Sequence, residues 1–363
     1  MSIKGKHMKK LLVLLGIIVL CLLAVGYFGS VTPVENIAGM EDEVPGDGIV
    51  VGFSQLGAES DWRTANTESM KSTFSEEKGY EFLFDDAQQK QENQIKAIRN
   101  FILQEVDYIV LAPVTETGWD TVLQEAKDAG IPVIIVDRMV DVADNRLFTA
   151  WVGSDFELEG KKACEWLHAY TKLKSIPAEN IHIVNIQGTI GASAQIGRTA
   201  SLRRAAKDYG WDLLAEESGE YTQAKAREVM GSFLKQYDNI NVVYCENDNE
   251  AFGAIEAIEN AGKRVGKDIE SGEIMIMSFD STNAGLTDVL EGKIALNIEC
   301  NPLHGPRVQS IIETLETGGT PDKQAYVEED MFATDTSVTS ITVNGFNYPV
   351  TKLTEAVLKE RTY

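Results

Sequence analysis

The sequence predicts an α/β protein built from two doubly wound parallel-sheet lobes that are joined by a hinge of several chain crossings. Two observations support this prediction. From Gly48 onward, short β-branched runs alternate with amphipathic stretches of about 12–18 residues, a pattern typical of βαβ units. In addition, segment 97–113 has the same layout as segment 229–247, so the two halves resemble two copies of one unit.

The first half supplies the strands and helices of one predicted lobe. Gly79 and Gly130 each close a predicted helix, because glycine readily adopts the left-handed backbone found at helix ends. The predicted strands are 49–54, 80–84, 108–112, 131–136 and 147–152, and the predicted helices are 62–78, 89–105 and 119–129.

The second half repeats this alternation, and the chain then returns to the first lobe. The predicted strands are 181–186, 212–216, 241–244 and 274–279, and the predicted helices are 193–209, 223–236 and 250–261. A strand over 294–299, a helix over 302–317 and extended pieces over 326–331 and 338–343 follow. We therefore expect one lobe from residues 48–153 plus 301–331, and the other from 154–300 plus 332–363.

The N-terminus has the pattern of an export signal. Four lysines precede an apolar run over residues 11–28, and a polar stretch with Pro, Gly and acidic residues follows. The apolar run is close to the length that spans a bilayer, so residues 1–29 are either a cleaved signal peptide or a retained membrane anchor. Cys21 follows the large Leu20, which disfavours lipidation. Residues 30–47 are predicted to be a tether, with the lobes outside the cytoplasm, in the periplasm or on the outer face of the membrane.

Composition and motifs exclude several function classes. The chain carries 56 acidic and 33 basic residues, and its net charge of −23 disfavours binding to nucleic acid. The four cysteines and four histidines lack the spacing of metal ligands, so neither a metal site nor a cofactor is expected. No phosphate-binding loop, dinucleotide fingerprint or nucleophile elbow occurs in the sequence, and we therefore expect a protein that is not an enzyme.

Polar and aromatic side chains follow the predicted strands, where open parallel sheets bind their ligands. Carboxylates, amides, guanidinium groups and aromatic faces together suit a sugar, which presents hydroxyl groups and apolar C–H faces. Each Asp or Asn in this position could equally be a helix cap or a turn residue. The candidate ligand-binding residues are Glu59, Trp62, Arg63, Asp86, Gln88, Asp137, Arg138, Arg198, Tyr221, Asn247, Asp248 and Asp280.

The charges of the candidates indicate a neutral ligand. Three arginines roughly balance four aspartates in this set, which fits a neutral polar ligand better than a phosphate or a dicarboxylate. Asp155 precedes a helix and is expected to cap it rather than to bind ligand.

From about Val50 to Tyr363, the sequence resembles the periplasmic binding proteins of bacterial ABC sugar importers, in the ribose and galactose group. The stretches that carry the resemblance are VGFSQLGAESDWR (51–63), DDAQQKQENQIKAIR (85–99), AKDAGIPVIIVDR (126–138), IQGTIGASAQIGR (186–198) and ENDNEAFGAI (246–255). Two of them, SDWR and QQKQENQ, are similar to the galactofuranose-binding branch. The resemblance implies a type I periplasmic-binding-protein fold and hinge closure around galactofuranose, galactose or a related monosaccharide.

The family pattern also implies roles for residues and partners. Trp62 would stack on the sugar beside Glu59 and Arg63, and Asp137 and Arg138 would hold hydroxyl groups from the first lobe. Cys300 stands where the ribose-binding pattern has a glutamine, which argues against ribose. The expected partners are an ABC permease and ATPase, and the expected state is a monomer. A sensor that presents sugar to a membrane histidine kinase or chemoreceptor remains an alternative, whereas a repressor is disfavoured because residues 1–47 contain no helix-turn-helix pattern.

Overall fold

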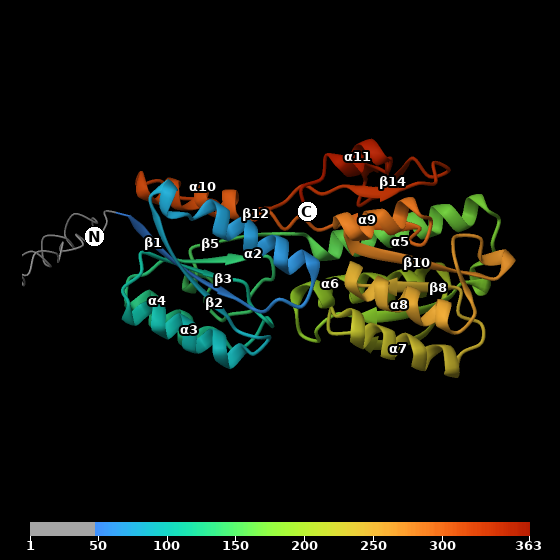
Figure 1. The fold of residues 1–363 in the computed structure, drawn as a ribbon, viewed down its shortest axis with the longest axis horizontal. Coiled ribbons are helices and arrows are strands. Elements are labelled where there is room, and N and C mark those ends of the chain that lie inside the picture. The colour runs from blue at the N-terminus through green and yellow to red at the C-terminus, as the bar shows by residue number, and fades with distance from the viewer. Residues whose placement is uncertain (1–47) are drawn as a thin grey trace, which may run out of the picture. The chain divides into compact units, whose positions relative to one another are not determined.

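Two mostly parallel sheets form the framework of the protein in the computed structural model, which describes residues 48–363 (Figure 1). The expected export signal or anchor and the tether, residues 1–47, lie outside the described residues. The described residues belong to one compact unit. Among residues 48–363, none of the helices has the length and apolar character needed to cross a membrane.

The first sheet has six parallel strands in the order β12-β5-β4-β3-β1-β2. Its strands are β1 (Ile49–Gln55), β2 (Tyr80–Asp86), β3 (Tyr108–Leu111), β4 (Val133–Val136), β5 (Ala150–Gly153) and β12 (Gln324–Tyr326). Its helices are α2 (Asp61–Thr73), α3 (Gln91–Leu103), α4 (Asp120–Asp128) and α10 (Gly305–Glu316). Strand β12, which comes late in the chain, therefore completes the lobe that the first half begins.

The second sheet follows the order β16-β13-β11-β10-β8-β6-β7, with β9 paired to β10. Only β13 runs antiparallel to its neighbour β11 among the described pairs of this sheet. Its strands are β6 (His182–Gln187), β7 (Asp212–Ser218), β8 (Val242–Cys245), β9 (Arg264–Val265), β10 (Glu273–Asp280), β11 (Leu296–Glu299), β13 (Met331–Ala333) and β16 (Thr351–Lys352). Its helices are α5 (Phe156–Leu173), α6 (Ser193–Tyr209), α7 (Gln223–Gln236), α8 (Asp248–Asn260), α9 (Asn283–Leu290) and α11 (Glu355–Lys359), and the hairpin β14 (Ser340–Val343) and β15 (Phe346–Pro349) packs beside α5.

Helices cover both faces of each sheet, which explains the continuous apolar strands. In β3, Ile109 and Leu111 pack with α3 and α4, whereas Tyr108 and Val110 pack with α2 and α10 on the other face. Successive strand residues point to opposite faces, so a strand buried on both sides must be apolar throughout. This arrangement leaves the carboxyl ends of the strands as the places where polar side chains can gather.

Three chain segments connect the two lobes. They lie between β5 and α5, between β11 and α10, and between β12 and β13. The sequence pattern placed residues 326–331 in one extended piece, but the structure divides this region between β12 and β13. Met331, the last residue expected in the first lobe, pairs with Ile298 of the second sheet. Asp155 caps α5 as expected, because its side chain accepts a hydrogen bond from the Leu158 amide.

Candidate functional site

A pocket with an empty volume of about 290 Å³ lies at the carboxyl ends of strands from both sheets. Its walls come from the loop after β1, the first turn of α2, the ends of β4, β10 and β11, and the starts of α5, α6, α7 and α8. The lining residues are Glu59, Ser60, Trp62, Arg63, Asp137, Arg138, Phe156, Ala194, Arg198, Tyr221, Asn247, Asp280 and Cys300. Nine of the twelve residues singled out from the sequence are therefore brought together here.

The other three candidates lie outside this lining. Asp86 and Gln88 are exposed and form a turn, in which the Asp86 carboxylate accepts the Gln88 amide at 2.8 Å. Asp86 ends β2, the edge strand of the first sheet, and Gln88 follows it, and neither residue lines the pocket. Asp248 is buried and accepts hydrogen bonds from Ser278, Thr282 and Asn297 at 2.6–2.9 Å, so it ties α8 to β10 and β11.

Four charged side chains of the first lobe form one buried network. The Arg63 guanidinium lies 2.7 Å from Asp137 and 3.2 Å from Glu59, and Arg138 lies 3.8 Å from the same Glu59 oxygen. Burial alone would raise the pKa of Asp137, but Arg63 and Arg138 outweigh burial and lower it. The network therefore holds an ionised carboxylate and two fixed guanidinium groups at the pocket wall.

Trp62 joins the first lobe to a chain crossing. Its indole N–H donates to the Cys300 carbonyl oxygen at 2.6 Å, and the Arg63 guanidinium lies 4.5 Å from the ring centroid. The edge of His304 packs against the ring. Only 4% of Trp62 is exposed, so the indole has one fixed orientation at the pocket wall.

The second lobe contributes a guanidinium group, a phenol and two further polar side chains. Arg198 donates to Glu159 at 2.7 Å and also to the Glu246 carbonyl oxygen, while Asp280 lies 4.0 Å from its second nitrogen. Burial raises the pKa of the Asp280 carboxyl well above its usual range, against the opposing effect of Arg198. Asn247 combines two roles, because it lines the pocket and caps α8.

Three pocket residues carry buried polar atoms without a hydrogen-bond partner among the described residues. These atoms are Glu59 Oε2, Arg63 Nη1 and the Tyr221 hydroxyl. A buried polar atom without a partner costs about 1–3 kcal/mol, so native proteins rarely retain one without reason. An acceptor, a charged donor and a hydroxyl group from both lobes are thus available to a polar ligand.

The backbone is shaped to bring these groups into the pocket. Asp137, Tyr221 and Asp280 adopt φ values of 62°, 60° and 104°, which are uncommon for residues other than glycine. A Cβ atom at Gly188 would lie 1.9 Å from the Tyr221 ring, so only glycine permits the close approach of that ring.

Direct hydrogen bonds join the two lobes around the pocket. The Asp61 amide donates to Asn249 at 3.1 Å, the Glu116 amide donates to the Gly191 carbonyl at 3.0 Å, and the Met139 amide donates to Ser193 at 2.9 Å. The lobes are therefore in contact across the pocket, as in a closed two-lobed protein.

Four of the lining residues are not among the twelve candidates. Ser60 caps α2, Phe156 and Ala194 lie at the starts of α5 and α6, and Cys300 follows β11. Phe156 and Ala194 carry no polar signal that could distinguish them from core residues. At Cys300, which stands where the ribose-binding pattern has a glutamine, the backbone carbonyl accepts a hydrogen bond from Trp62.

The pocket lining has balanced charges. Three guanidinium groups (Arg63, Arg138, Arg198) face three carboxyl groups (Glu59, Asp137, Asp280). A strongly charged ligand would leave part of either set uncompensated, whereas a neutral ligand with several hydroxyl groups can use both. No general acid and base pair is needed for such binding.

Comparisons with known proteins agree with this geometry. Residues 51–302 match the family model described as a periplasmic binding protein domain. The chain is 39% identical over 294 residues to the galactofuranose-binding protein YtfQ of Escherichia coli (strain K12), covering 80% of this chain and 89% of that protein. It is 29% identical over 289 residues to the fructose import binding protein FruE of Bifidobacterium longum, covering 78% and 84%.

Solved structures of sugar-binding proteins are also similar to this chain. A Mycobacterium smegmatis protein in complex with β-D-fucofuranose superposes with a TM-score of 0.74 at 40% identity, covering 78% of this chain and 91% of that one. The binding component of the arabinose ABC transporter of Shewanella sp. ANA-3, bound to α- and β-L-arabinofuranose, has a TM-score of 0.73 at 40% identity, covering 79% and 92%.

Proposed function

The chain belongs to the periplasmic binding protein family, and on that basis we propose that it is the solute-binding component of an ABC sugar importer. It would capture a monosaccharide outside the cytoplasm, between its two lobes, and release it to a membrane permease powered by an ATPase. Binding rather than catalysis is the proposed activity, because its relatives are solute-binding proteins.

One structural observation supports the proposal most strongly. Glu59 Oε2, Arg63 Nη1 and the Tyr221 hydroxyl are buried, have no hydrogen-bond partner within residues 48–363 and belong to the lining of one small pocket. A sugar hydroxyl both donates and accepts, so one ring with several hydroxyl groups can satisfy an acceptor, a charged donor and a phenol together. The proposed contacts are these three residues with Trp62, Asp137, Arg138, Arg198, Asn247 and Asp280.

A five-membered sugar ring is the proposed ligand form. Relatives at 39–40% identity are described with galactofuranose, β-D-fucofuranose and L-arabinofuranose. The pocket is small and is enclosed by side chains of both lobes, which favours a single monosaccharide over a longer saccharide. Galactofuranose or a related furanose is therefore the first ligand to test.

The location and the attachment of the protein are part of the proposal. We propose that residues 1–29 direct export and that residues 30–47 tether the lobes outside the cytoplasm. Whether the leader is cleaved or retained decides between a released and an anchored protein. We further propose that the protein acts as a monomer, since each copy contains both halves of the pocket.

Calorimetric titration with L-arabinose, D-galactose and methyl β-D-galactofuranoside tests the proposed function. Arg138→Ala should weaken binding about 10- to 150-fold, because a hydrogen bond to a charged group contributes about 1.5–3 kcal/mol. The matched control is Arg264→Ala, whose side chain is 63% exposed and lies away from the pocket. Wild-type affinity in Arg138→Ala, or no binding of any of these sugars by the unmutated protein, would contradict the proposal.

A further inference from the structure

The three segments that connect the lobes are tied together at one carboxyl group. Glu329 lies between β12 and β13, and one of its oxygens accepts from the Ser154 hydroxyl at 2.6 Å and from the Asn301 amide at 2.7 Å. Ser154 belongs to the crossing between β5 and α5, and Asn301 to the crossing between β11 and α10. A single side chain therefore contacts both other crossings of the hinge.

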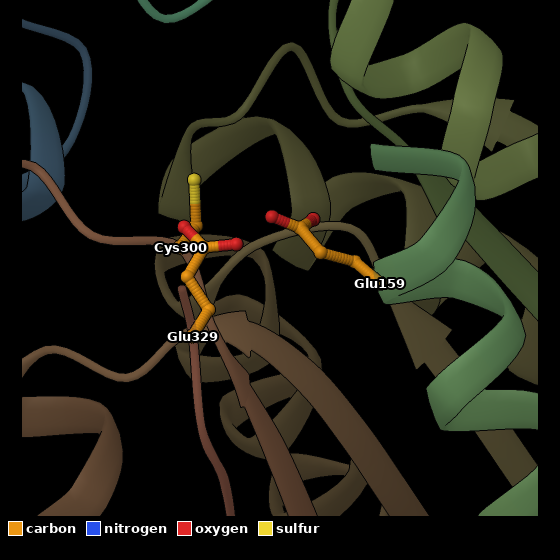
Figure 2. Close-up of side chains that lie close together, drawn as sticks. All are labelled: Glu159, Cys300 and Glu329. Carbon is orange, nitrogen blue, oxygen red and sulfur yellow. The ribbon is translucent and has the colours of Figure 1, made fainter. Parts of the chain in front are cut away.

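A second carboxyl group, Glu159 of α5, faces Glu329. Figure 2 shows the two groups with their oxygens directed toward each other and the Cys300 thiol beside them. One oxygen of each carboxyl group and the thiol sulfur all lie within 4.8 Å of one another. Glu159 is 1% exposed, and its Oε2 accepts a hydrogen bond from Arg198 at 2.7 Å. Its Oε1 has no other partner among the described residues and is available to accept a proton from Glu329.

A buried carboxylate and a half-buried one at this distance cannot both be ionised at little cost. Of the two glutamates, Glu159 pairs with Arg198 and Glu329 does not, so Glu159 is the better-stabilised anion and Glu329 the better proton carrier. Burial raises the pKa of Glu329 well above its usual range, and the charge of Glu159 raises it further. Burial also raises the pKa of Glu159, against the effect of Arg198, so the pair titrates as a unit.

Other charged or titratable groups face the pair from each neighbouring element. Lys162 donates to the Glu329 carbonyl oxygen at 3.0 Å and does not neutralise its carboxyl group directly. The groups that face the pair are Arg198 on α6, Lys162 on α5, Glu299 on β11, Asp280 on β10 and the Cys300 thiol.

We propose that Glu329 carries a proton that it donates to Glu159 at the junction of the three crossings, and that sugar binding takes up this proton as the lobes close. The proposal rests on the proposed function. Glu159 orients Arg198, a pocket residue, and is thereby a positioning residue that links the pocket to the hinge.

The proposal predicts a direction for the pH dependence of binding. If rotation of the lobes separates the pair, the pKa of Glu329 in the open protein falls toward the ordinary value for glutamate, because the charge of Glu159 no longer raises it. Closure then raises its proton affinity, so the complex binds more protons than the free protein. Sugar affinity should fall as pH rises above that ordinary value, by up to about tenfold per pH unit, until the closed-state pKa is passed.

The decisive variant is Glu329→Gln. The glutamine oxygen can still accept from Ser154 and Asn301, and its amide nitrogen can donate permanently to Glu159, which reproduces the protonated pair. Glu328→Gln is the matched control, because Glu328 is the adjacent acidic residue, is exposed and lies outside the pocket lining. The dissociation constant for L-arabinose or methyl β-D-galactofuranoside is measured by calorimetry from pH 5 to pH 8 for the full-length protein and both variants.

The ratio of wild-type to Glu329→Gln dissociation constants should rise with pH, whereas the ratio for Glu328→Gln should stay constant. The ratio of dissociation constants cancels the pH dependence that Asp280 and other titratable groups contribute equally to all three proteins. Calorimetry in buffers of different ionisation enthalpy should also show proton uptake on binding by the wild type and less uptake by Glu329→Gln. A constant ratio with unchanged proton uptake would overturn the proposal.

Unfolding of the sugar-free protein tests the open state, in which the pair is separated. The wild type and Glu329→Gln should show a parallel pH dependence of unfolding from pH 5 to pH 8, because neither holds the shared proton without sugar. A loss of wild-type stability relative to Glu329→Gln over this range, or stabilisation by Zn²⁺ that Glu329→Gln abolishes, would overturn the proposal. Sugar binding with a constant ratio of dissociation constants would overturn this proposal and leave the proposed function intact, whereas no binding of any of the sugars would contradict both.

Discussion

Removing one hydroxyl group from Tyr221 gives a sharp test of the pocket. Tyr221 is 4% exposed, its ring lies 5.1 Å from the Arg138 guanidinium, and its hydroxyl has no partner among the described residues. Tyr221→Phe keeps the ring and its packing against Gly188 and removes only the oxygen. The variant therefore removes the proposed ligand contact and no hydrogen bond within the part of the chain that the structure describes.

The magnitude follows from the energy of one neutral hydrogen bond. Such a bond contributes about 0.5–1.5 kcal/mol net, so Tyr221→Phe should weaken sugar binding about 2- to 13-fold. The free energy of unfolding of the sugar-free protein should not decrease, because the lost hydroxyl was buried without a partner. Calorimetric titration gives the affinity, and urea unfolding gives the stability.

Tyr170→Phe is the matched control for this experiment. The Tyr170 hydroxyl is also in the second lobe, but it donates to the Lys267 carbonyl oxygen at 3.2 Å, away from the pocket. Tyr170→Phe should lose about 0.5–1.5 kcal/mol of stability and keep its affinity. Unchanged affinity in Tyr221→Phe, or a stability loss like that of Tyr170→Phe, would refute the assignment of its hydroxyl to the ligand.

Further predictions concern charge, structure, pH and motion. Glu59→Gln should weaken sugar binding about tenfold or more in calorimetry, because it removes a charged acceptor and leaves Arg63 with one carboxylate partner. Asp248→Asn should lower the free energy of unfolding by about 1–3 kcal/mol in urea and keep its dissociation constant within about twofold, because Asp248 lies outside the pocket lining. Burial raises the pKa of Glu246 to about 7, so wild-type stability should fall as pH rises from about 4.5 to 7, by about 3 kcal/mol at most, and Glu246→Gln should flatten this fall in urea unfolding. Small-angle scattering should show a smaller radius of gyration with sugar, and an unchanged radius with confirmed binding would reject closure.

The regular parts of the fold could be predicted because both sheets are buried on both faces. The predicted helices over 193–209 and 223–236 have the bounds of α6 and α7. Strands such as β3 and β8 are short apolar runs, and their neighbours in the sequence are amphipathic helices. The edge strand β12 could not be found in the same way, because its three residues (QAY) form no apolar run and two of them are exposed.

The pocket could be predicted only in part, for reasons that lie in sheet order and side-chain direction. A position after a strand indicates the correct edge of the sheet, but the order of the strands decides which loops meet. Asp86 and Gln88 lie at the carboxyl end of the edge strand β2 and so lie outside the pocket. Asn247 and Asp248 are adjacent in sequence, yet one lines the pocket and the other is directed into the core beneath α8.

A crystal structure of the protein with methyl β-D-galactofuranoside or L-arabinose bound tests the central claim most directly. The account predicts one sugar between the lobes, with hydroxyl groups at hydrogen-bond distance, about 2.6–3.2 Å, from Glu59 Oε2, Arg63 Nη1 and the Tyr221 hydroxyl. The account would be contradicted by a sugar bound elsewhere on the protein, or by a sugar in this pocket whose hydroxyl groups contact none of these three atoms.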